Sequence, residues 1–191
     1  MKPVTVQQLA DFAAGTLRGG DPTRLVTTVQ TDSRAIAAGD VFVALQGPRF
    51  DAHNFVAAVA TAGAAAIVVS RWDSAWEGLP CSFIITDDTT TALQAMAAKY
   101  RAWHNPLLIG LTGSNGKTST KDLAAAVLSP LYKTTATLGN LNNELGVPIT
   151  LLSLKDGDQC AVVEMGMNHP GEMKTLVDIA RPDAAIITNV G

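Results

Sequence analysis

The chain has 191 residues, of which 47% are hydrophobic and 16% charged, and its formal net charge is −3. The apolar share is large enough to bury one large core or two smaller ones, which excludes a disordered chain. The slight acidity offers no basic surface to a nucleic acid, so a phosphate group would have to bind at a local site. A small anionic ligand therefore fits this chain better than a polyanion does.

The two cysteines, Cys81 and Cys160, each lie in an apolar run that predicts a buried strand. Free thiols in such positions indicate a reducing compartment and not a disulfide framework. Residues 1–15 carry charges and glutamines where a signal peptide has an unbroken apolar stretch, and no later run approaches the roughly 18 apolar residues of a membrane span. We therefore expect a cytoplasmic protein without membrane contact. No residue pattern bears on its oligomeric state, and a monomer is the default.

The first part of the chain, residues 1–86, predicts a small α/β domain. Thr5 and Gln8 have the spacing of a capping box, which predicts a helix from Thr5 to about Gly15. The pattern then indicates two strands, a polar loop, a helix and a further strand, at residues 25–34, 40–46, 47–54, 55–63 and 64–70.

The remaining residues, 87–191, predict a second domain. A helix begins near Asp88 and ends at Asn105-Pro106, because proline disfavours helical backbone in the residue before it. Strands are then expected at residues 107–112, 132–137, 160–166 and 184–190, and helical segments at 118–131, around 142–154 and at 171–182. The strands are apolar throughout, which predicts a mostly parallel sheet covered by helices on both faces. Because such sheets bind ligands just beyond their strand ends, we expect this domain to continue past Gly191.

The stretch LIGLTGSNGKTST, residues 108–120, has the parts of a phosphate-binding loop. An apolar strand leads into it, Gly113 and Gly116 flank its turn, and a helical pattern follows at once. In such a loop backbone N–H groups surround phosphate, while Lys117 would reach the β and γ phosphates and Thr118 would offer its hydroxyl to Mg²⁺. Leu111 stands where the usual pattern has its leading glycine, which a strand end tolerates if the loop is shortened.

A β-hairpin is the alternative for the same stretch, because Asn-Gly is the strongest two-residue hairpin signal. A hairpin needs a second strand after its turn. Residues 118–131 instead have the alanine and leucine content and the spacing of a helix. Nucleotide binding is therefore the better interpretation.

Several segments resemble the Mur ligases, the ATP-dependent amino-acid and peptide ligases of bacterial cell-wall precursor synthesis. Besides the shortened loop these are TDSR from Thr31, GDVFVALQG from Gly39, DAHNF from Asp51, GNLNNELGVPITLL from Gly139, EMGMNHPGEM from Glu164 and RPDAAIITNVG at the end. They occur in the family's order along nearly the whole chain. The resemblance implies a UDP-sugar-binding domain at residues 1–86 and an incomplete ATP-binding central domain at residues 87–191. One departure is Ala52, where a glycine is expected.

The resemblance also implies an ATP and Mg²⁺ site in the second domain. Lys117 and Glu164 would be catalytic, and Thr118 and Glu164 would bind Mg²⁺, because Glu164 ends a strand at the carboxyl edge of the sheet. The expected ATP-binding residues are Gly113, Ser114, Asn115, Gly116, Lys117, Thr118, Ser119, Asn140 and Asn143. A helix-capping role is the alternative for Glu164, and a turn or cap role is equally consistent with the asparagines. His169 precedes an expected helix, where a capping role competes with a site role.

In the first domain the resemblance implies contacts to the uracil or pyrophosphate of a UDP-sugar. Ser33 and Arg34 follow a strand-like run and can donate hydrogen bonds to such a ligand, and Asp51 and His53 lie on a polar loop. The alternative for Arg34 is an ion pair with Asp32 or Asp40. No basic cluster supports pyrophosphate binding independently here.

Within the family, the segments most resemble the ligase that joins D-alanyl-D-alanine to UDP-N-acetylmuramoyl-tripeptide. The implied reaction transfers the ATP γ-phosphoryl group to the peptide carboxylate, and the amine of the dipeptide then displaces phosphate. A sister ligase that adds a diamino acid to the dipeptide precursor and a nucleotide-binding module without catalysis are the alternatives. Because further parts of the site are expected beyond Gly191, these 191 residues alone are not expected to catalyse the reaction.

Overall fold

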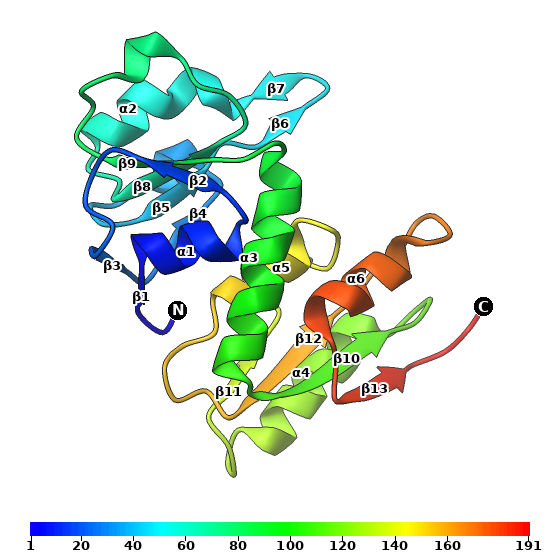
Figure 1. Ribbon diagram of the computed structural model, residues 1–191. Helices are drawn as coiled ribbons and strands as arrows, with labels where there is room; N and C mark the ends of the chain where they lie inside the picture. Colours follow the sequence, from blue (N-terminus) through cyan, green and yellow to red (C-terminus); the bar gives the residue numbers. More distant parts are fainter. The chain divides into compact units, whose positions relative to one another are not determined.

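A computed structural model describes all 191 residues and shows an α/β fold in two units (Figure 1). One unit is Pro3–Met96, and the other is Ala97–Gly191 together with Met1–Lys2. The division falls inside helix α3 (Thr89–His104), whereas the sequence placed the domain boundary between residues 86 and 87. A continuous helix crosses the division, so no linker sequence marks it. None of the helices is long and apolar enough to cross a bilayer.

The unit Pro3–Met96 contains a five-stranded sheet in the order β2-β9-β8-β5-β4. Its strands are β2 (Thr16–Arg18), β4 (Val29–Gln30), β5 (Val41–Val43), β8 (Ala66–Val69) and β9 (Ser82–Ile85). All neighbours pair in parallel except the edge strand β2, which is antiparallel to β9. Two small antiparallel pairs accompany the sheet: β1 (Val4–Thr5) with β3 (Leu25–Val26), and β6 (Gln46–Gly47) with β7 (Phe50–Asp51).

Local side-chain hydrogen bonds decide where several elements of this unit begin. Helix α1 (Val6–Phe12) starts at the predicted capping box, in which Thr5 Oγ1 accepts from the Gln8 amide and Gln8 Oε1 accepts from the Thr5 amide. The single strand predicted at 25–34 is wrong: it is divided into β3, β4 and a 3₁₀ turn, η1 (Ser33–Ala35). Asp32 turns the chain there, because its side chain accepts from the Arg34 amide.

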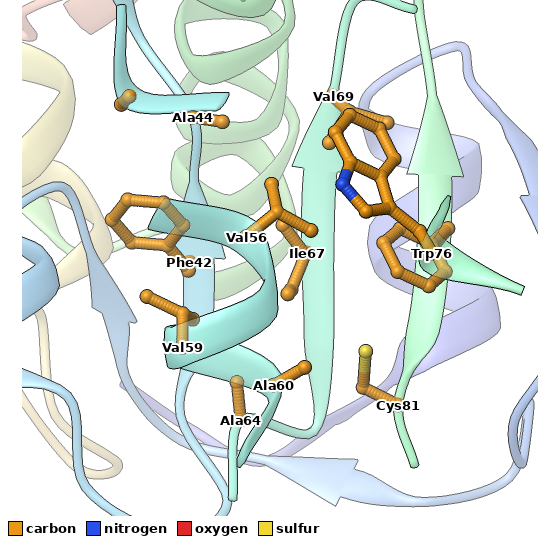
Figure 2. Packing of buried hydrophobic residues seen from close by; sticks show 12 residues of the cluster. Phe42, Ala44, Val56, Val59, Ala60, Ala64, Ile67, Val69, Trp76 and Cys81 are labelled. Carbon is orange, nitrogen blue, oxygen red and sulfur yellow. The ribbon is translucent and has the colours of Figure 1, made fainter. Parts of the chain in front are cut away.

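The core of this unit lies between the sheet and helix α2 (Val56–Thr61), as Figure 2 shows. Val56, Val59 and Ala60 have the i, i+3, i+4 spacing that places them on one helical face, and all three are buried. They pack in one cluster with Phe42 of β5 and Ile67 of β8. The helix therefore covers one face of the parallel strands, as their uniformly apolar sequences predict.

Both cysteines are buried and free, as the sequence predicts. Cys81 belongs to the same cluster, and burial raises the pKa of its thiol to about 11. Cys160 begins strand β12 of the other unit.

The unit that ends at Gly191 contains a four-stranded, fully parallel sheet in the order β11-β12-β10-β13. Its strands are β10 (Leu107–Thr112), β11 (Thr134–Ala136), β12 (Cys160–Glu164) and β13 (Ala184–Ile187), and the connecting helices are α4 (Lys117–Leu128), α5 (Gly146–Leu152) and α6 (Glu172–Ala180). With right-handed crossovers, α4 covers one face of this sheet while α5 and α6 cover the other, an arrangement that can be followed in Figure 1. The chain therefore leaves β10 toward one face of the sheet, where α4 lies, and leaves the adjacent strand β12 toward the other face, where α6 lies. This divergence opens a crevice at the carboxyl ends of the two strands.

Arg101, in the part of α3 that belongs to this unit, ties the helix to the segment before β13. Its buried guanidinium donates to the Ala180 and Arg181 carbonyls and to the Asp183 carboxylate at 2.9, 3.2 and 2.8 Å. Asp183 Oδ2 also accepts from the Leu108 amide, and this bond together with Arg101 lowers the pKa of Asp183. Arg101 thus fixes the chain as it enters the edge strand.

Replacing Arg101 with methionine is expected to lower the free energy of unfolding by about 2 kcal/mol, because buried carbonyls lose a charged donor. Urea unfolding at neutral pH measures the change. Lys99→Met, an exposed position on the same helix, is the control and should change stability by less than about 0.5 kcal/mol. Equal stabilities for the two variants would contradict the clamping role of Arg101.

Candidate functional site

The predicted phosphate loop connects β10 to α4, and the hairpin alternative is excluded. Helix α4 begins at Lys117, and Gly116 before it has a φ of 78°. Leu111 is fully buried and pairs with Glu164 of β12 and Ile186 of β13, so the residue at the missing glycine position packs inside the sheet as predicted. The N–H groups in the first turn of α4 have no partners within the helix, as at every helix start. They point toward the carboxyl end of the sheet and suit an anion.

Gly113 has to be glycine for two reasons. Its φ of 144° is a backbone conformation that other residues rarely adopt. In addition, a Cβ atom at this position would lie 2.0 Å from Thr188 Oγ1. The loop therefore packs directly on the residues that follow β13.

Asn189 and Lys117 hold the loop in its present shape. The Ser114 amide donates to the Asn189 carbonyl at 3.1 Å, and the Asn115 amide donates to Asn189 Oδ1 at 2.8 Å. Lys117 curls back over the loop, and its Nζ donates to the Gly113 carbonyl at 2.7 Å. The sequence did not single out Asn189, because its contact with the loop depends on the pairing of β13 with β10.

Glu164 ends β12 with its side chain buried, at 2% exposure. Its Oε1 accepts from Asn142 Nδ2 at 2.8 Å, while its Oε2 is buried without any hydrogen-bond partner. An unpaired, buried carboxylate oxygen is unfavourable unless a cation or a donor binds it. Glu164 does not cap the following helix: Glu172 itself accepts from the Asn168 and His169 amides before α6. The capping alternative is therefore excluded.

The three neighbouring asparagines have different positions. Asn142, which the sequence also offers as a phosphate or metal contact, is the one that reaches Glu164. The side-chain oxygen of Asn143 accepts from the Leu145 and Gly146 amides at the start of α5, so this side chain serves as a cap. Asn140 is exposed, and its predicted contact with ATP stays a prediction. His169 is exposed in the turn before α6, and its amide is bound by Glu172.

A cavity of about 460 Å³ adjoins the phosphate loop. It is lined by Thr112, Gly113, Ser114, Lys117, Met167, Asn168, Met173, Ile187, Asn189 and Val190. Most of these residues follow β10, β12 or β13, so the cavity lies at the carboxyl edge of the sheet. Nowhere in the chain do three or more His, Cys, Asp or Glu side chains lie close enough together to hold a metal ion by themselves.

In the unit Pro3–Met96, a second cavity of about 450 Å³ is lined by Thr31, Asp32, Ser33, Arg34, Phe50 and Phe55. Two of the four predicted sugar-nucleotide contacts, Ser33 and Arg34, therefore share one pocket. Phe50 and Phe55 form its aromatic side, with ring centroids 5.8 Å apart and an interplanar angle of 23°. Neither ring is predicted from the sequence, because an exposed phenylalanine has no signature that separates it from a core residue.

Arg34 forms an ion pair with Asp32, which was one of the alternatives to a ligand contact. Its Nε and Nη2 donate to the two carboxylate oxygens of Asp32 at 2.9 and 2.7 Å, although the arginine side chain is 87% exposed. The side-chain and backbone hydrogen bonds from Arg34 lower the pKa of Asp32 to about 2. A ligand contact of Arg34 stays a prediction that must use its other N–H groups.

Asp51 and His53 form a local bonding network. His53 is fully buried, with Nδ1 2.7 Å from Asp51 Oδ1 and Nε2 accepting from the Ser70 amide at 3.0 Å. A direct contact between His53 and a substrate would require one of these bonds to break; in this structure the side chain joins Asp51 to the Ser70 backbone. Asp51 also accepts from Arg71 at 2.8 Å. Ala52 between them has no positive φ, which explains why alanine can replace the expected glycine.

The network predicts a pH dependence of stability. Burial raises the pKa of Asp51, but hydrogen bonds from the His53 backbone and from the Arg71 and His53 side chains outweigh it and bring the value to about 2. Because the pKa of this carboxyl group in the unfolded chain is about 3.9, ionised Asp51 stabilises the fold above about pH 4 and loses this effect as the pH falls toward 2. Asp51→Asn should therefore be less stable than wild type at pH 7, by a difference that shrinks below pH 4. Urea unfolding across this range measures it, with exposed Asp87→Asn as the control; a pH-independent difference would contradict the assignment.

Comparison with known families agrees with this geometry. The family profile described as "Mur ligase family, catalytic domain" matches residues 25–101, and "Mur ligase middle domain" matches residues 111–191. The chain belongs to the Mur ligase family. The first profile covers the pocket lined by Ser33, Arg34 and Phe50, and the second covers the loop 113–118.

Two curated relatives of this Mur ligase chain have the same name. The UDP-N-acetylmuramoyl-tripeptide--D-alanyl-D-alanine ligases of Bacillus subtilis and Escherichia coli are 42% and 43% identical to it over 190 residues. These alignments include 98% and 100% of the chain but 41% of each relative. The chain thus spans about two fifths of the length of the relatives that it matches.

Solved structures show the same fold. A structure of MurF from Acinetobacter baumannii matches 99% of this Mur ligase chain with a TM-score of 0.90 and 41% identity, over 41% of its own length. MurF from Thermotoga maritima, solved in complex with ADP, matches 87% of the chain with a TM-score of 0.77 and 32% identity, over 38% of its length. A diaminopimelate-adding ligase of the family matches at 18% identity with a TM-score of 0.60, which shows a shared fold alone.

Proposed function

We propose that this chain is the sugar-nucleotide-binding and ATP-binding part of a ligase that joins D-alanyl-D-alanine to UDP-N-acetylmuramoyl-tripeptide. The observation that carries the proposal is a phosphate loop whose strand β10 is directly paired with the strand that ends in buried Glu164. Identity of 42–43% along the whole chain to ligases of this name supports the choice of substrates. The activity belongs to cell-wall precursor synthesis in bacteria.

ATP is proposed to bind at the loop 113–118. The first turn of α4 supplies N–H donors, and Lys117 exchanges its bond to the Gly113 carbonyl for the β and γ phosphates. The cavity next to the loop would receive the triphosphate and the carboxylate that accepts the phosphoryl group. An ADP complex of the related Thermotoga maritima protein is consistent with a nucleotide at this fold.

Glu164 and Thr118 would hold Mg²⁺. The buried, unpaired Oε2 of Glu164 is an anionic oxygen of the kind that this ion prefers, and Mg²⁺ commonly uses one or two protein ligands together with phosphate oxygens. This fits a site without a cluster of three acidic side chains. When bound, the ion supplies positive charge to the transferred phosphoryl group.

The proposed reaction has two steps. Lys117 and the loop N–H groups orient the γ-phosphoryl group while the peptide carboxylate attacks it, which gives an acyl phosphate and ADP. The free amine of D-alanyl-D-alanine then attacks the acyl carbon, and inorganic phosphate leaves as the amide bond forms. Both steps depend on positioning and charge stabilisation, so no nucleophilic side chain is needed.

The UDP part of the substrate is proposed to bind in the pocket of the first unit. Phe50 and Phe55 are 55% and 38% exposed and offer aromatic surface on which a uracil ring can stack, and Ser33 supplies a hydroxyl at the same pocket. Asp51 and His53 would hold the hairpin that carries Phe50 and would not touch the ligand.

Phosphate release from ATP tests the proposed function in the full-length protein. Release is expected only when UDP-N-acetylmuramoyl-tripeptide and D-alanyl-D-alanine are both present, with an amide-linked product detected by mass spectrometry. Release with the dipeptide precursor and a diamino acid would assign the protein to the sister ligase. ATP binding without release under either condition would leave a nucleotide-binding module and would refute the ligase proposal.

A further inference from the structure

Lys121 is a buried cation that the proposed reaction does not use. It lies on α4 one turn after Lys117, and its side chain is 5% exposed. Lysine is almost never buried without partners, because removal of the ammonium group from water is unfavourable. The groups that Lys121 contacts therefore indicate what this lysine does in the fold.

The main partner of Lys121 is the backbone of Thr137, just after β11. Lys121 Nζ donates to the Thr137 carbonyl at 2.8 Å, and it also lies 3.2 Å from the carboxylate of Asp122, which is 68% exposed. The Thr137 amide donates to the Val162 carbonyl of β12 at 3.0 Å. Lys121 thus fixes Thr137 against the strand that carries Glu164.

Thr137 in turn contacts Glu164 directly. Its buried hydroxyl accepts from the Glu164 amide at 2.9 Å. Five residues later, Asn142 donates to the Glu164 carboxylate, and the Asn142 carbonyl accepts from the Gly166 amide at 2.8 Å. Both ends of the segment 137–142 are therefore attached to Glu164 or its neighbour, and Lys121 holds the first end.

We propose that Lys121 is a positioning residue for the metal-binding carboxylate: through Thr137 it sets Glu164 relative to the helix that begins with the phosphate-loop lysine. Lys117 and Lys121 lie on one face of α4, because residues four apart project from the same side of a helix. The same helix therefore places Lys117 at the phosphate loop and Lys121 at Thr137, which binds Glu164. This role rests on the proposed function only in taking Glu164 as the metal ligand.

Direct metal binding tests the role in the full-length protein. Mn²⁺ is titrated in the presence of ADP and followed by electron paramagnetic resonance, for wild type, Glu164→Gln, Lys121→Met and Lys133→Met. Lys121→Met should weaken Mn²⁺ binding about 10-fold, the size expected when a group that supports a metal ligand is lost, while ADP affinity without metal stays unchanged. Lys133→Met, which removes an exposed lysine from the same unit, should bind Mn²⁺ like wild type.

Thr137 gives a second test that retains the lysine. Thr137→Val removes the hydroxyl that binds Glu164 and should weaken Mn²⁺ binding as Lys121→Met does, whereas Thr137→Ser keeps the hydroxyl and should bind normally. The double variant Lys121→Met/Thr137→Val should bind Mn²⁺ about as weakly as either single variant, because both substitutions act through the contact between Thr137 and Glu164. If Lys121→Met fails to fold, the comparison of the two Thr137 variants decides.

The outcomes separate this inference from the proposed function. If Glu164→Gln weakens Mn²⁺ binding but Lys121→Met and Thr137→Val do not, Lys121 has only a structural role and the inference is overturned alone. If wild type binds no Mn²⁺ with ADP, or Glu164→Gln binds it normally, the assignment of the metal site and the inference both fail.

Discussion

Replacement of Lys117 by alanine is expected to weaken ATP binding by the full-length protein about 10- to 100-fold. The estimate follows from the loss of a charged hydrogen bond of about 1.5–3 kcal/mol between the ammonium group and phosphate. Titration calorimetry measures the affinity. The unfolding temperature should stay unchanged, because the Lys117 side chain donates only to the Gly113 carbonyl, in a loop that is mostly exposed.

Lys174→Ala is the matched control for Lys117→Ala. Lys174 is an exposed lysine of the same unit that pairs with Asp178 on α6, and its loss should leave ATP affinity at the wild-type value. If Lys117→Ala bound ATP as tightly as this control, residues 113–118 would not be the nucleotide site.

The second large effect is expected at Glu164. Glutamine has nearly the same size and can still accept from Asn142, but it lacks the negative charge at the buried Oε2. The Mg²⁺ concentration for half-maximal activity should therefore rise at least about 10-fold, with a much smaller change in metal-free ATP affinity. Ligase rates across a Mg²⁺ titration measure the first quantity, and calorimetry with EDTA measures the second.

Glu77→Gln provides the comparison for Glu164→Gln, because Glu77 is exposed and pairs weakly with Arg18 at 3.6 Å. It should leave the Mg²⁺ requirement unchanged. An unaltered requirement in Glu164→Gln as well would return Glu164 to a purely structural role, bound to Asn142.

The parts of the site that the sequence predicts are those that depend on local patterns. An apolar strand, two glycines, a lysine and a helical repeat stand next to one another between residues 107 and 131, so strand β10, the loop and α4 follow from neighbouring residues alone. Glu164 is predicted for a similar reason, because the end of an apolar strand fixes which edge of the sheet it reaches.

The rest depends on distances in space that spacing along the chain does not give. Adjacent asparagines 142 and 143 have opposite uses, and the turn before α5 decides which one faces Glu164. Asn189 reaches the loop only because β13 pairs with β10. Lys121 appears as an ordinary polar residue on a helix, and its burial is evident only when β11 is placed beside β12.

Short-range hydrogen bonds also override the patterns in the first unit. The run at residues 25–34 is typical of one strand, but it forms two separate strands, and Asp32 accepts from the Arg34 amide in the 3₁₀ turn that follows them. The same carboxylate binds the Arg34 guanidinium. From the sequence, this ion pair and a ligand contact were both possible for Arg34. Phe50 and Phe55 could not be predicted as pocket residues for a different reason. Composition alone does not distinguish an apolar side chain that is exposed at a pocket from one in the core.

The most direct test of the account is a crystal structure of the full-length protein with a non-hydrolysable ATP analogue and Mg²⁺. We expect the β-phosphate within hydrogen-bond distance of the backbone N–H groups at the start of α4, with Lys117 turned from the Gly113 carbonyl to the phosphates. We also expect an ion bound by Thr118 and by Glu164 Oε2. A triphosphate bound away from residues 113–118, or an ion that leaves Glu164 Oε2 unbound, would contradict the proposed site.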